Sequence, residues 1–247
     1  MTGRIGALFL IAFNFLLLGG IGILNHMKNI LVAGGTDGIG LAFVRRLELE
    51  KYQKVFILGR NFKQVAELKL PNAIELPCDI TNNDSLVDTI GKIDQPLDEF
   101  VNTIGTFYKS PTEKMDPSDI ARHFEVNAVG NINLTNAVLS KLNAAYAQIL
   151  ACSATLALEA REHYALQSAT KAAYRYYLET LRKEKKDTLK VMALYPSSVN
   201  TSIFKKSGDM RNTLVYPSPD AIADIMYFML AQPRQIYIPE IRVDNFS

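Results

Sequence analysis

From residue 27 onward, short apolar runs alternate with stretches whose apolar residues recur every three or four positions. Continuous apolar runs of four or five residues are typical of parallel strands buried on both faces. Strands are predicted at 30–33, 55–58, 73–76, 100–103, 147–151, 190–194 and 235–238. Helical spacing, as in Ile39, Phe43 and Leu47, predicts helices at 38–50, 62–70, 82–93, 118–142, 167–186 and 220–231.

Strands that are separated by single helices become parallel neighbours through right-handed crossovers. The pattern therefore predicts an α/β fold of the Rossmann type, a doubly wound parallel sheet with helices on both faces. No linker rich in proline or glycine interrupts residues 27–247, so we expect a single domain over that range.

Residues 1–26 differ from the rest, because Ile5 to Leu24 is an apolar run interrupted only by Asn14 and four glycines. About 20 apolar residues are enough to span a bilayer as a helix. Two interpretations stay open. Either residues 5–24 anchor the protein in a membrane, or Met27 is the true first residue and the protein is cytoplasmic.

Composition excludes several classes of function. The formal net charge is +2, from 27 basic and 25 acidic side chains, which predicts no basic surface for nucleic acid. The two cysteines, Cys78 and Cys152, have no paired spacing, so neither a disulfide framework nor a zinc site is expected. The histidines match no ligand spacing either, and no metal is predicted; they are His26, His123 and His163.

A glycine-rich turn, Gly34-Gly35-Thr36-Asp37-Gly38-Ile39-Gly40, follows the first predicted strand. Its glycines allow a tight turn and let the backbone approach a pyrophosphate. The helix that begins here presents free N–H groups and the positive end of its dipole to that anion. Because the turn lies between a buried strand and an amphipathic helix, it predicts a dinucleotide-binding site.

The residue that follows the second strand indicates which dinucleotide is bound. In NAD-binding sites, an acidic residue about 20 positions after the turn binds the ribose 2′-hydroxyl. This chain has Arg60 there, in Gly59-Arg60-Asn61. A guanidinium suits a 2′-phosphate through charge-assisted hydrogen bonds, so NADP(H) is predicted over NAD(H).

The spacing Gly-x-x-x-Gly-x-Gly resembles that of the short-chain dehydrogenase/reductase family, and further motifs of that family follow in order over about residues 28–202. The resemblance implies an oxidoreductase acting on a carbonyl or alcohol substrate. It also implies further cofactor contacts from Asp79, Ile80, Asn102, Thr103, Gly105, Lys171, Val199 and Thr201.

The same resemblance implies catalytic roles for three residues. Asn127 would hold a water of the proton relay, Ser153 would bind the substrate carbonyl, and Lys171 would hold the nicotinamide ribose. In the family that lysine also lowers the pKa of a tyrosine four residues earlier, which places both side chains on one helix face.

In this chain the position of that tyrosine is Gln167, whose amide can donate a hydrogen bond but no proton. Three hypotheses stay open. In the first, Tyr164 replaces the missing acid. In the second, Ser153, Lys171 and a water chain support slower chemistry while Gln167 polarises the carbonyl. In the third, the protein is a catalytically silent NADP(H)-binding sensor, scaffold or partner subunit. A weak NADP(H)-dependent oxidoreductase is favoured, because loss of one general acid typically costs about 10²–10⁴-fold and leaves positioning intact.

The segment after Thr201 matches the lid of the family. As a lid, it would offer Ile203 and Phe204 to an apolar ligand and Lys205 or Lys206 to an acidic one; a solvated loop is the alternative. The family also pairs its two long helices between subunits, so a homodimer or homotetramer is expected by analogy.

Overall fold

The computed structural model describes residues 27–246, which contain a seven-stranded sheet in the order β3-β2-β1-β4-β5-β6-β7. All neighbouring strands are parallel. The strands are β1 (Lys28–Ala33), β2 (Tyr52–Gly59), β3 (Ala73–Pro77), β4 (Glu99–Asn102), β5 (Ala147–Cys152), β6 (Leu189–Pro196) and β7 (Glu240–Val243). The predicted doubly wound fold is confirmed, and its order reverses at β1, where such sheets open a crevice for ligands.

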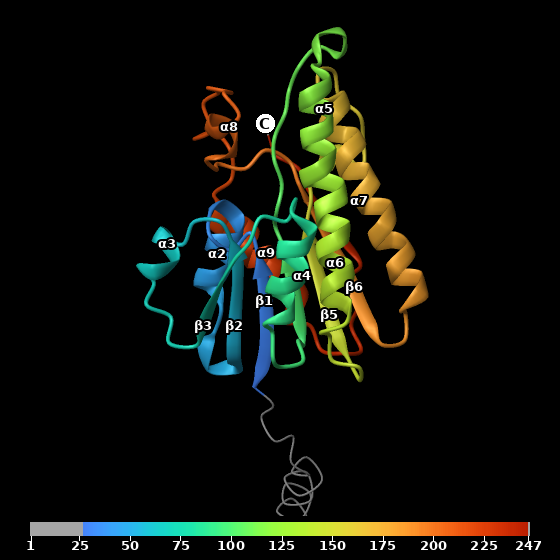
Figure 1. Cartoon of the computed structure of the whole chain (residues 1–247). Helices are drawn as coiled ribbons and strands as arrows, with labels where there is room; N and C mark the ends of the chain where they lie inside the picture. The colour runs from blue at the N-terminus through green and yellow to red at the C-terminus, as the bar shows by residue number, and fades with distance from the viewer. Residues whose placement is uncertain (1–26, 247) are drawn as a thin grey trace, which may run out of the picture.

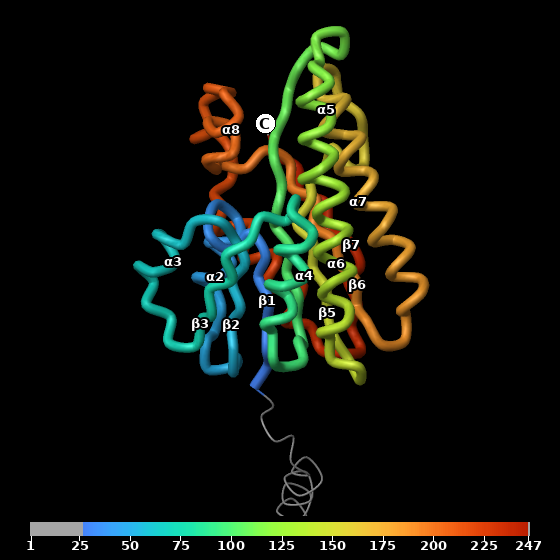
Figure 2. The backbone as a smooth tube through the Cα atoms, viewed as in Figure 1, coloured from blue at the N-terminus to red at the C-terminus, as the bar shows by residue number. Residues whose placement is uncertain are grey.

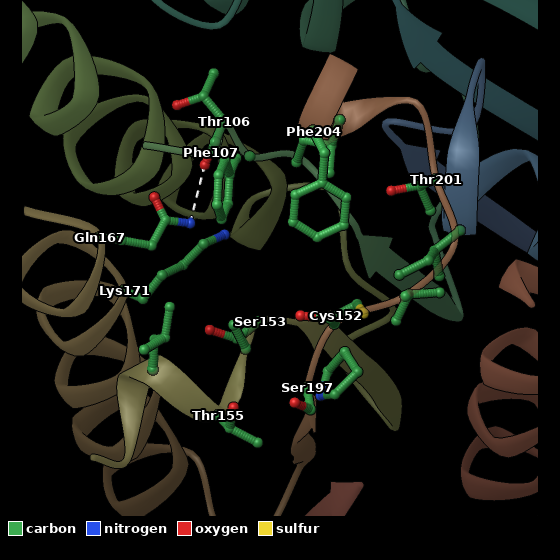
Figure 3. A pocket seen from close by; sticks show the side chains of 18 of the residues that line it. Thr106, Phe107, Cys152, Ser153, Thr155, Gln167, Lys171, Ser197, Thr201 and Phe204 are labelled. Atoms are coloured by element: carbon green, nitrogen blue, oxygen red, sulfur yellow. Dashed lines mark hydrogen bonds between the residues drawn. The ribbon is translucent and has the colours of Figure 1, made fainter. Parts of the chain in front are cut away.

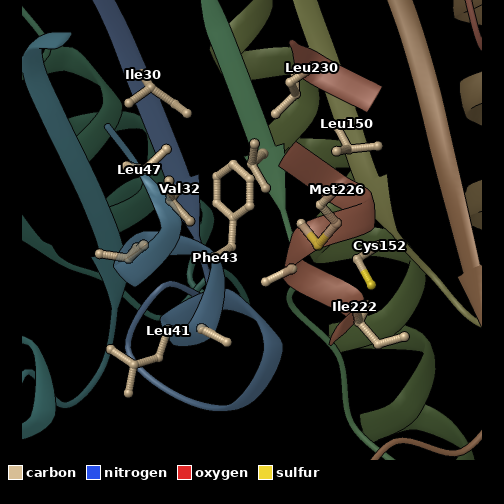
Figure 4. Close-up of a cluster of buried hydrophobic side chains, with 14 of the residues drawn as sticks. Ile30, Val32, Leu41, Phe43, Leu47, Leu150, Cys152, Ile222, Met226 and Leu230 are labelled. Carbon is tan, nitrogen blue, oxygen red and sulfur yellow. The ribbon is translucent and has the colours of Figure 1, made fainter. Parts of the chain in front are cut away.

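Helices cover both faces of the sheet (Figure 1). One face carries α2 (Gly38–Arg46) and α9 (Pro219–Leu230), and the other carries α4 (Asn83–Gly91), α5 (Pro117–Phe124), α6 (Asn131–Leu139) and α7 (Ala165–Glu184). On the first face, Phe43 of α2 and Met226 of α9 are fully buried together with Val32 of β1 (Figure 4). Strands that lie between two such layers are buried on both sides, which explains their continuous apolar runs.

The predicted helix at 118–142 is interrupted by a π-helical stretch. Residues Glu125–Gly130 (η3) join α5 to α6 with wider turns. The side chain of Asn131, the first residue of α6, donates to the carbonyl of Val126 in this stretch over 2.8 Å. Such π-turns gather at functional sites, and this one contains Asn127.

Two of the predicted helices are longer than the helices in the structure. The predicted helix at 38–50 ends at Arg46 and is followed by a short 3₁₀ turn, η1 (Leu49–Lys51), that leads into β2. The predicted helix at 62–70 shrinks to α3 (Lys63–Ala66). Lys69 there has a positive φ of 50°, which ends helical geometry two residues before Pro71.

The predicted last strand at 235–238 is wrong. These residues form a turn and a loop, and the last strand is β7, which pairs with β6 from Ala193↔Glu240 onward. Two prolines, Pro233 and Pro239, bound the loop, and Ile236 and Tyr237 are substantially exposed. Apolar character alone therefore did not place the strand.

The loops after the strands gather at the carboxyl edge of the sheet (Figure 2). They include three short helical turns, η2 (Thr112–Lys114), η4 (Thr155–Ala157) and α8 (Ile203–Lys206). Within residues 27–246, no helix is long and apolar enough to cross a membrane. The apolar run at 5–24 lies outside the described residues.

Candidate active site

A pocket opens at the carboxyl edge, where the segments that follow β4, β5 and β6 meet. Residues singled out from the sequence line it together, although they are far apart along the chain: Ile39, Thr103, Gly105, Ser153, Gln167, Lys171 and Thr201. Tyr164, Val199, Ile203 and Phe204 line it as well. In Figure 3, Ser153, Gln167 and Lys171 lie on one side of the pocket, and Thr201 and Phe204 lie on the other.

The glycine-rich turn has the backbone geometry that its glycines predict. Gly34 and Gly38 have φ values of 78° and 53°, in the left-handed region that favours glycine. A Cβ on Gly40 would overlap the Gly34 carbonyl, so the turn is as tight as the motif requires. A Cβ on Gly38 would lie 3.6 Å from Thr201, so it is the positive φ rather than a steric clash that favours glycine at this position.

Asp37 caps α2 and also joins it to α8. Its carboxylate accepts a hydrogen bond from the Gly38 amide over 2.8 Å and another from the Ser202 hydroxyl over 2.8 Å. It also forms an ion pair with Lys206. Burial opposes ionisation, but the hydrogen bonds from Lys206 and Ser202 dominate and lower the pKa of Asp37.

Arg60 and Asp79 lie at the carboxyl ends of the neighbouring strands β2 and β3. Arg60 is 77% exposed, and its Nη1 lies 3.8 Å from Asp79 Oδ2. Hydrogen bonds from the Thr81 amide hold the pKa of Asp79 below its usual value, against the opposing effect of burial. Ile80 is buried, and a Cβ on Gly130 of η3 would lie only 3.0 Å from it.

Asn102 and Thr103 fix the segment that follows β4. The Asn102 amide donates to Asn131 over 2.8 Å and to the Tyr174 hydroxyl over 3.1 Å, which ties the strand to α6 and α7. The Thr103 hydroxyl donates to the Ala33 carbonyl over 3.0 Å and so ties the strand to β1. Asn102 is buried outside the pocket lining, whereas Thr103 is part of it.

Asn127 and Gln167 both bind the backbone of Thr106. Asn127 accepts from the Thr106 amide over 2.8 Å and donates to its carbonyl over 3.2 Å. Gln167 Nε2 donates to the same carbonyl over 3.0 Å, as the dashed line in Figure 3 shows. Gln167 is 4% exposed, and its Oε1 is buried without a hydrogen-bond partner.

Ser153 and Lys171 present unpartnered polar groups to the pocket. The Ser153 amide is anchored on the Leu194 carbonyl over 2.8 Å, but its hydroxyl is buried without a partner. Lys171 is 7% exposed, and burial lowers its pKa. Burial also raises the pKa of the neighbouring Cys152 thiol to about 12, against the positive charge of Lys171.

Tyr164 precedes α7 and packs edge-to-face against Phe107, with ring centroids 6.0 Å apart. Its hydroxyl accepts a hydrogen bond from Arg211 Nη2 over 3.1 Å. Arg211 and Arg161 both line the pocket, and sequence analysis singled out neither. The sequence instead predicts Lys205 or Lys206 as the cation for an acidic ligand. Lys206 is paired with Asp37, and the cation that reaches the pocket from this segment is Arg211.

These residues fit a nicotinamide dinucleotide. Within the first turn of α2, the Gly38 amide is bound by Asp37, whereas the Ile39 and Gly40 amides have no acceptor within the helix and can donate to an anion. Lys171 Nζ lies close to Gly105, because a Cβ on that glycine would be 2.6 Å from it. Ser153 and Lys171 line the pocket, where the polar end of each can form a hydrogen bond with a bound ligand.

Comparison with known proteins places the chain in a family. Residues 28–212 match the family model described as short chain dehydrogenase. The chain therefore belongs to the short-chain dehydrogenase/reductase family, a family of oxidoreductases.

Individual relatives agree with that assignment. The chain is 30% identical to the uncharacterized oxidoreductase DltE of Bacillus subtilis (strain 168), over 82% of this chain and 83% of that protein. It is 23% identical to the NADP-dependent 3-hydroxy acid dehydrogenase of Schizosaccharomyces pombe, over 87% of this chain and 92% of that protein. Among solved structures, an alcohol dehydrogenase from Thermococcus sibiricus complexed with 5-hydroxy-NADP has the same fold. Its TM-score is 0.80 at 20% identity, over 88% of this chain and 96% of that one.

Proposed function

We propose that the protein is an NADP(H)-dependent oxidoreductase that interconverts a carbonyl and an alcohol, with an altered proton donor. The observation that carries the proposal is the buried, unpartnered Ser153 hydroxyl beside Lys171. A buried hydroxyl without a partner costs about 1–3 kcal/mol, and a substrate carbonyl would supply that partner.

The chemistry divides among few side chains. A bound nicotinamide supplies or accepts the hydride. Ser153 donates a hydrogen bond to the carbonyl oxygen, and Lys171 holds the ribose. Gln167 has one amide hydrogen committed to the Thr106 carbonyl, which supports a structural role for it. Tyr164 supplies the proton, because its oxygen accepts from Arg211 and its own hydrogen is left free to donate into the pocket.

The cofactor preference is tested by Arg60→Asp. We expect this change to lower the affinity for NADPH about tenfold or more and to favour NADH, because a carboxylate replaces a charge-assisted donor beside Asp79. Calorimetry with both nucleotides measures the effect. Lys92→Asp, at the far end of α4, is the matched control and is expected to change neither affinity. If the Arg60 variant prefers NADPH over NADH to the same extent as the wild type, the role of Arg60 in binding the 2′-phosphate is wrong.

The proton donor is tested by Tyr164→Phe and Gln167→Tyr in a panel of carbonyl substrates. Tyr164→Phe is expected to lower kcat by at least about tenfold while leaving NADPH binding intact, since general acids contribute about 10²–10⁴-fold. Gln167→Tyr is expected to raise kcat within that same range, because it places a phenol four residues before Lys171. No response to either change would overturn the proposed roles.

A catalytically silent NADP(H)-binding protein is the second candidate. It is favoured by the Gln167 amide, which faces the Thr106 backbone and leaves Lys171 without a phenol partner. Tight NADPH binding, no turnover across the panel and no effect of Tyr164→Phe would support this second function over the first.

A further inference from the structure

Basic side chains line the pocket. Its lining contains three positively charged side chains, Arg161, Lys171 and Arg211, and none of its described lining residues is aspartate or glutamate. Lys171 lies beside the ribose position, but the two arginines come from segments outside the dinucleotide motifs. Arg161 follows η4, and Arg211 lies in the loop between α8 and α9. A ligand in this pocket therefore meets arginine side chains that the dinucleotide motifs do not supply.

Arg211 is held in place from four sides. Its guanidinium carbon lies 4.5 Å from the centroid of the Phe204 ring and 5.1 Å from that of Phe107. Nη2 donates to the Tyr164 hydroxyl and to Asp209. The side chain is only 17% exposed, although it belongs to a loop. A planar guanidinium fixed in this way loses little rotamer freedom when it binds a ligand.

Arg211 nevertheless keeps unused donors. A guanidinium has five N–H groups, and Nη2 commits both of its hydrogens to Tyr164 and Asp209. Among the described residues, Nε has no partner and Nη1 donates to none. Asp209 does not line this pocket, so its carboxylate does not block the face of Arg211 that the pocket meets.

We propose that Arg211 binds the carboxylate of the substrate, so that the substrate class is an oxo acid and its product the hydroxy acid. This inference rests on the proposed function. A carboxylate matches the guanidinium in geometry as well as charge. Arg161 also lines the pocket, but its Nε and Nη2 both donate to Glu159. Glu159 also pairs with Arg242, which pairs in turn with Asp244, so this cluster of four side chains has no net charge and Arg211 is the cation assigned to the carboxylate.

The test uses dead-end complexes, which require no turnover. Protein saturated with NADPH is titrated calorimetrically with 3-hydroxybutyrate and separately with its methyl ester. We expect the acid to bind about 10- to 100-fold more tightly than the ester, as one charge-assisted pair provides. Arg211→Gln is expected to abolish that preference, and Arg211→Lys to keep part of it. Arg234→Gln, an exposed arginine at the amino edge of β5, is the matched control and should retain it fully.

A second variant is expected to raise the affinity for the acid, a result that misfolding of the variant would not produce. Asp209→Asn removes the competing carboxylate, so the acid should bind several-fold more tightly while the ester is unaffected. Equal binding of acid and ester by wild-type protein, or a preference that survives Arg211→Gln, would overturn the inference while the proposed function stands. Failure of wild-type protein to bind NADPH would overturn the proposed function itself.

Discussion

Gln167 changes the surroundings of two other side chains. Where the family has a phenol, this chain has an amide turned toward the Thr106 carbonyl. The Ser153 hydroxyl is buried without a hydrogen-bond partner, and Lys171 has no phenol four residues before it. Burying Lys171 costs more free energy than burying the Ser153 hydroxyl, because burial disfavours the charged form of the lysine and lowers its pKa.

We therefore expect Lys171→Met to stabilise the cofactor-free protein and to abolish NADPH binding. The unfolded lysine binds a proton more readily than the folded one, so stability of the wild type rises as pH increases through the lowered pKa. At pH 7 the variant should gain about 1–3 kcal/mol in free energy of unfolding, the usual cost of an unsatisfied buried polar group. Urea denaturation at pH 7 and 10 measures this, and the difference should shrink at the higher pH. A variant less stable than wild type at pH 7 would contradict the account.

Many of the candidate site residues could be predicted from motif spacing, because each motif residue lies at a strand end or a helix start that the hydrophobic pattern predicts. Ser153 and Thr103 follow buried strands, and both line the pocket. The presence of Arg211 in the pocket could not be predicted from the sequence, because its position depends on the path of an irregular loop and on stacking against Phe107 and Phe204. No local pattern encodes that path.

At the scale of elements, Asp37 connects the start of α2 with α8. It satisfies the amide of Gly38 and at the same time binds Ser202 and Lys206. One carboxylate thus fixes both the glycine-rich turn and the segment that carries Phe204 into the pocket.

Two substitutions separate these effects. Asp37→Asn keeps a capping side chain but loses the ion pair, and we expect a loss of about 0.5–1 kcal/mol at pH 7, because both partners are partly exposed. Asp37→Ala should lose about 1 kcal/mol more through the missing cap. Since the folded pKa of Asp37 is lowered, its contribution is present above the unfolded value and disappears as pH falls through the folded one. Chemical denaturation at pH 7 and at pH 3 checks this: wild type and Asp37→Asn should differ less at the lower pH.

Most elements were predictable because fully buried parallel strands need unbroken apolar runs. β7 was not, because it is an edge strand in which apolar and polar residues alternate. Its register is set by contacts distant in sequence: Glu240 accepts hydrogen bonds from Arg182 over 3.1 Å and from Tyr195 over 3.3 Å. The π-turn at Glu125–Gly130 was likewise invisible in an otherwise helical pattern.

On the whole molecule, three large apolar side chains remain exposed on adjoining helices. Phe124 and Val129 lie on the helix formed by α5, η3 and α6, and Tyr176 lies on α7. Both helices lie side by side on one face of the sheet (Figure 1). Exposed apolar groups of this kind are typical of subunit interfaces, which agrees with the expected pairing of the two long helices.

We expect the protein to sediment as a dimer or tetramer and Val129→Glu to shift it toward monomer, because a buried carboxylate would be unpaired at the interface. Phe228→Glu, which alters an equally exposed apolar residue on α9 of the opposite face, is the matched control and should leave the assembly unchanged. Sedimentation velocity distinguishes these outcomes, and a monomeric wild type would refute the prediction.

The parallel sheet has a practical consequence for protein engineering. Apart from Cys152 and Pro196, which end β5 and β6, the pocket is lined by segments that connect the strands, whereas the strands themselves are packed between two helical layers. Ligand preference can therefore be redesigned one segment at a time, by exchanging the stretch before α5 or the stretch after β6, without disturbing the scaffold that supports them.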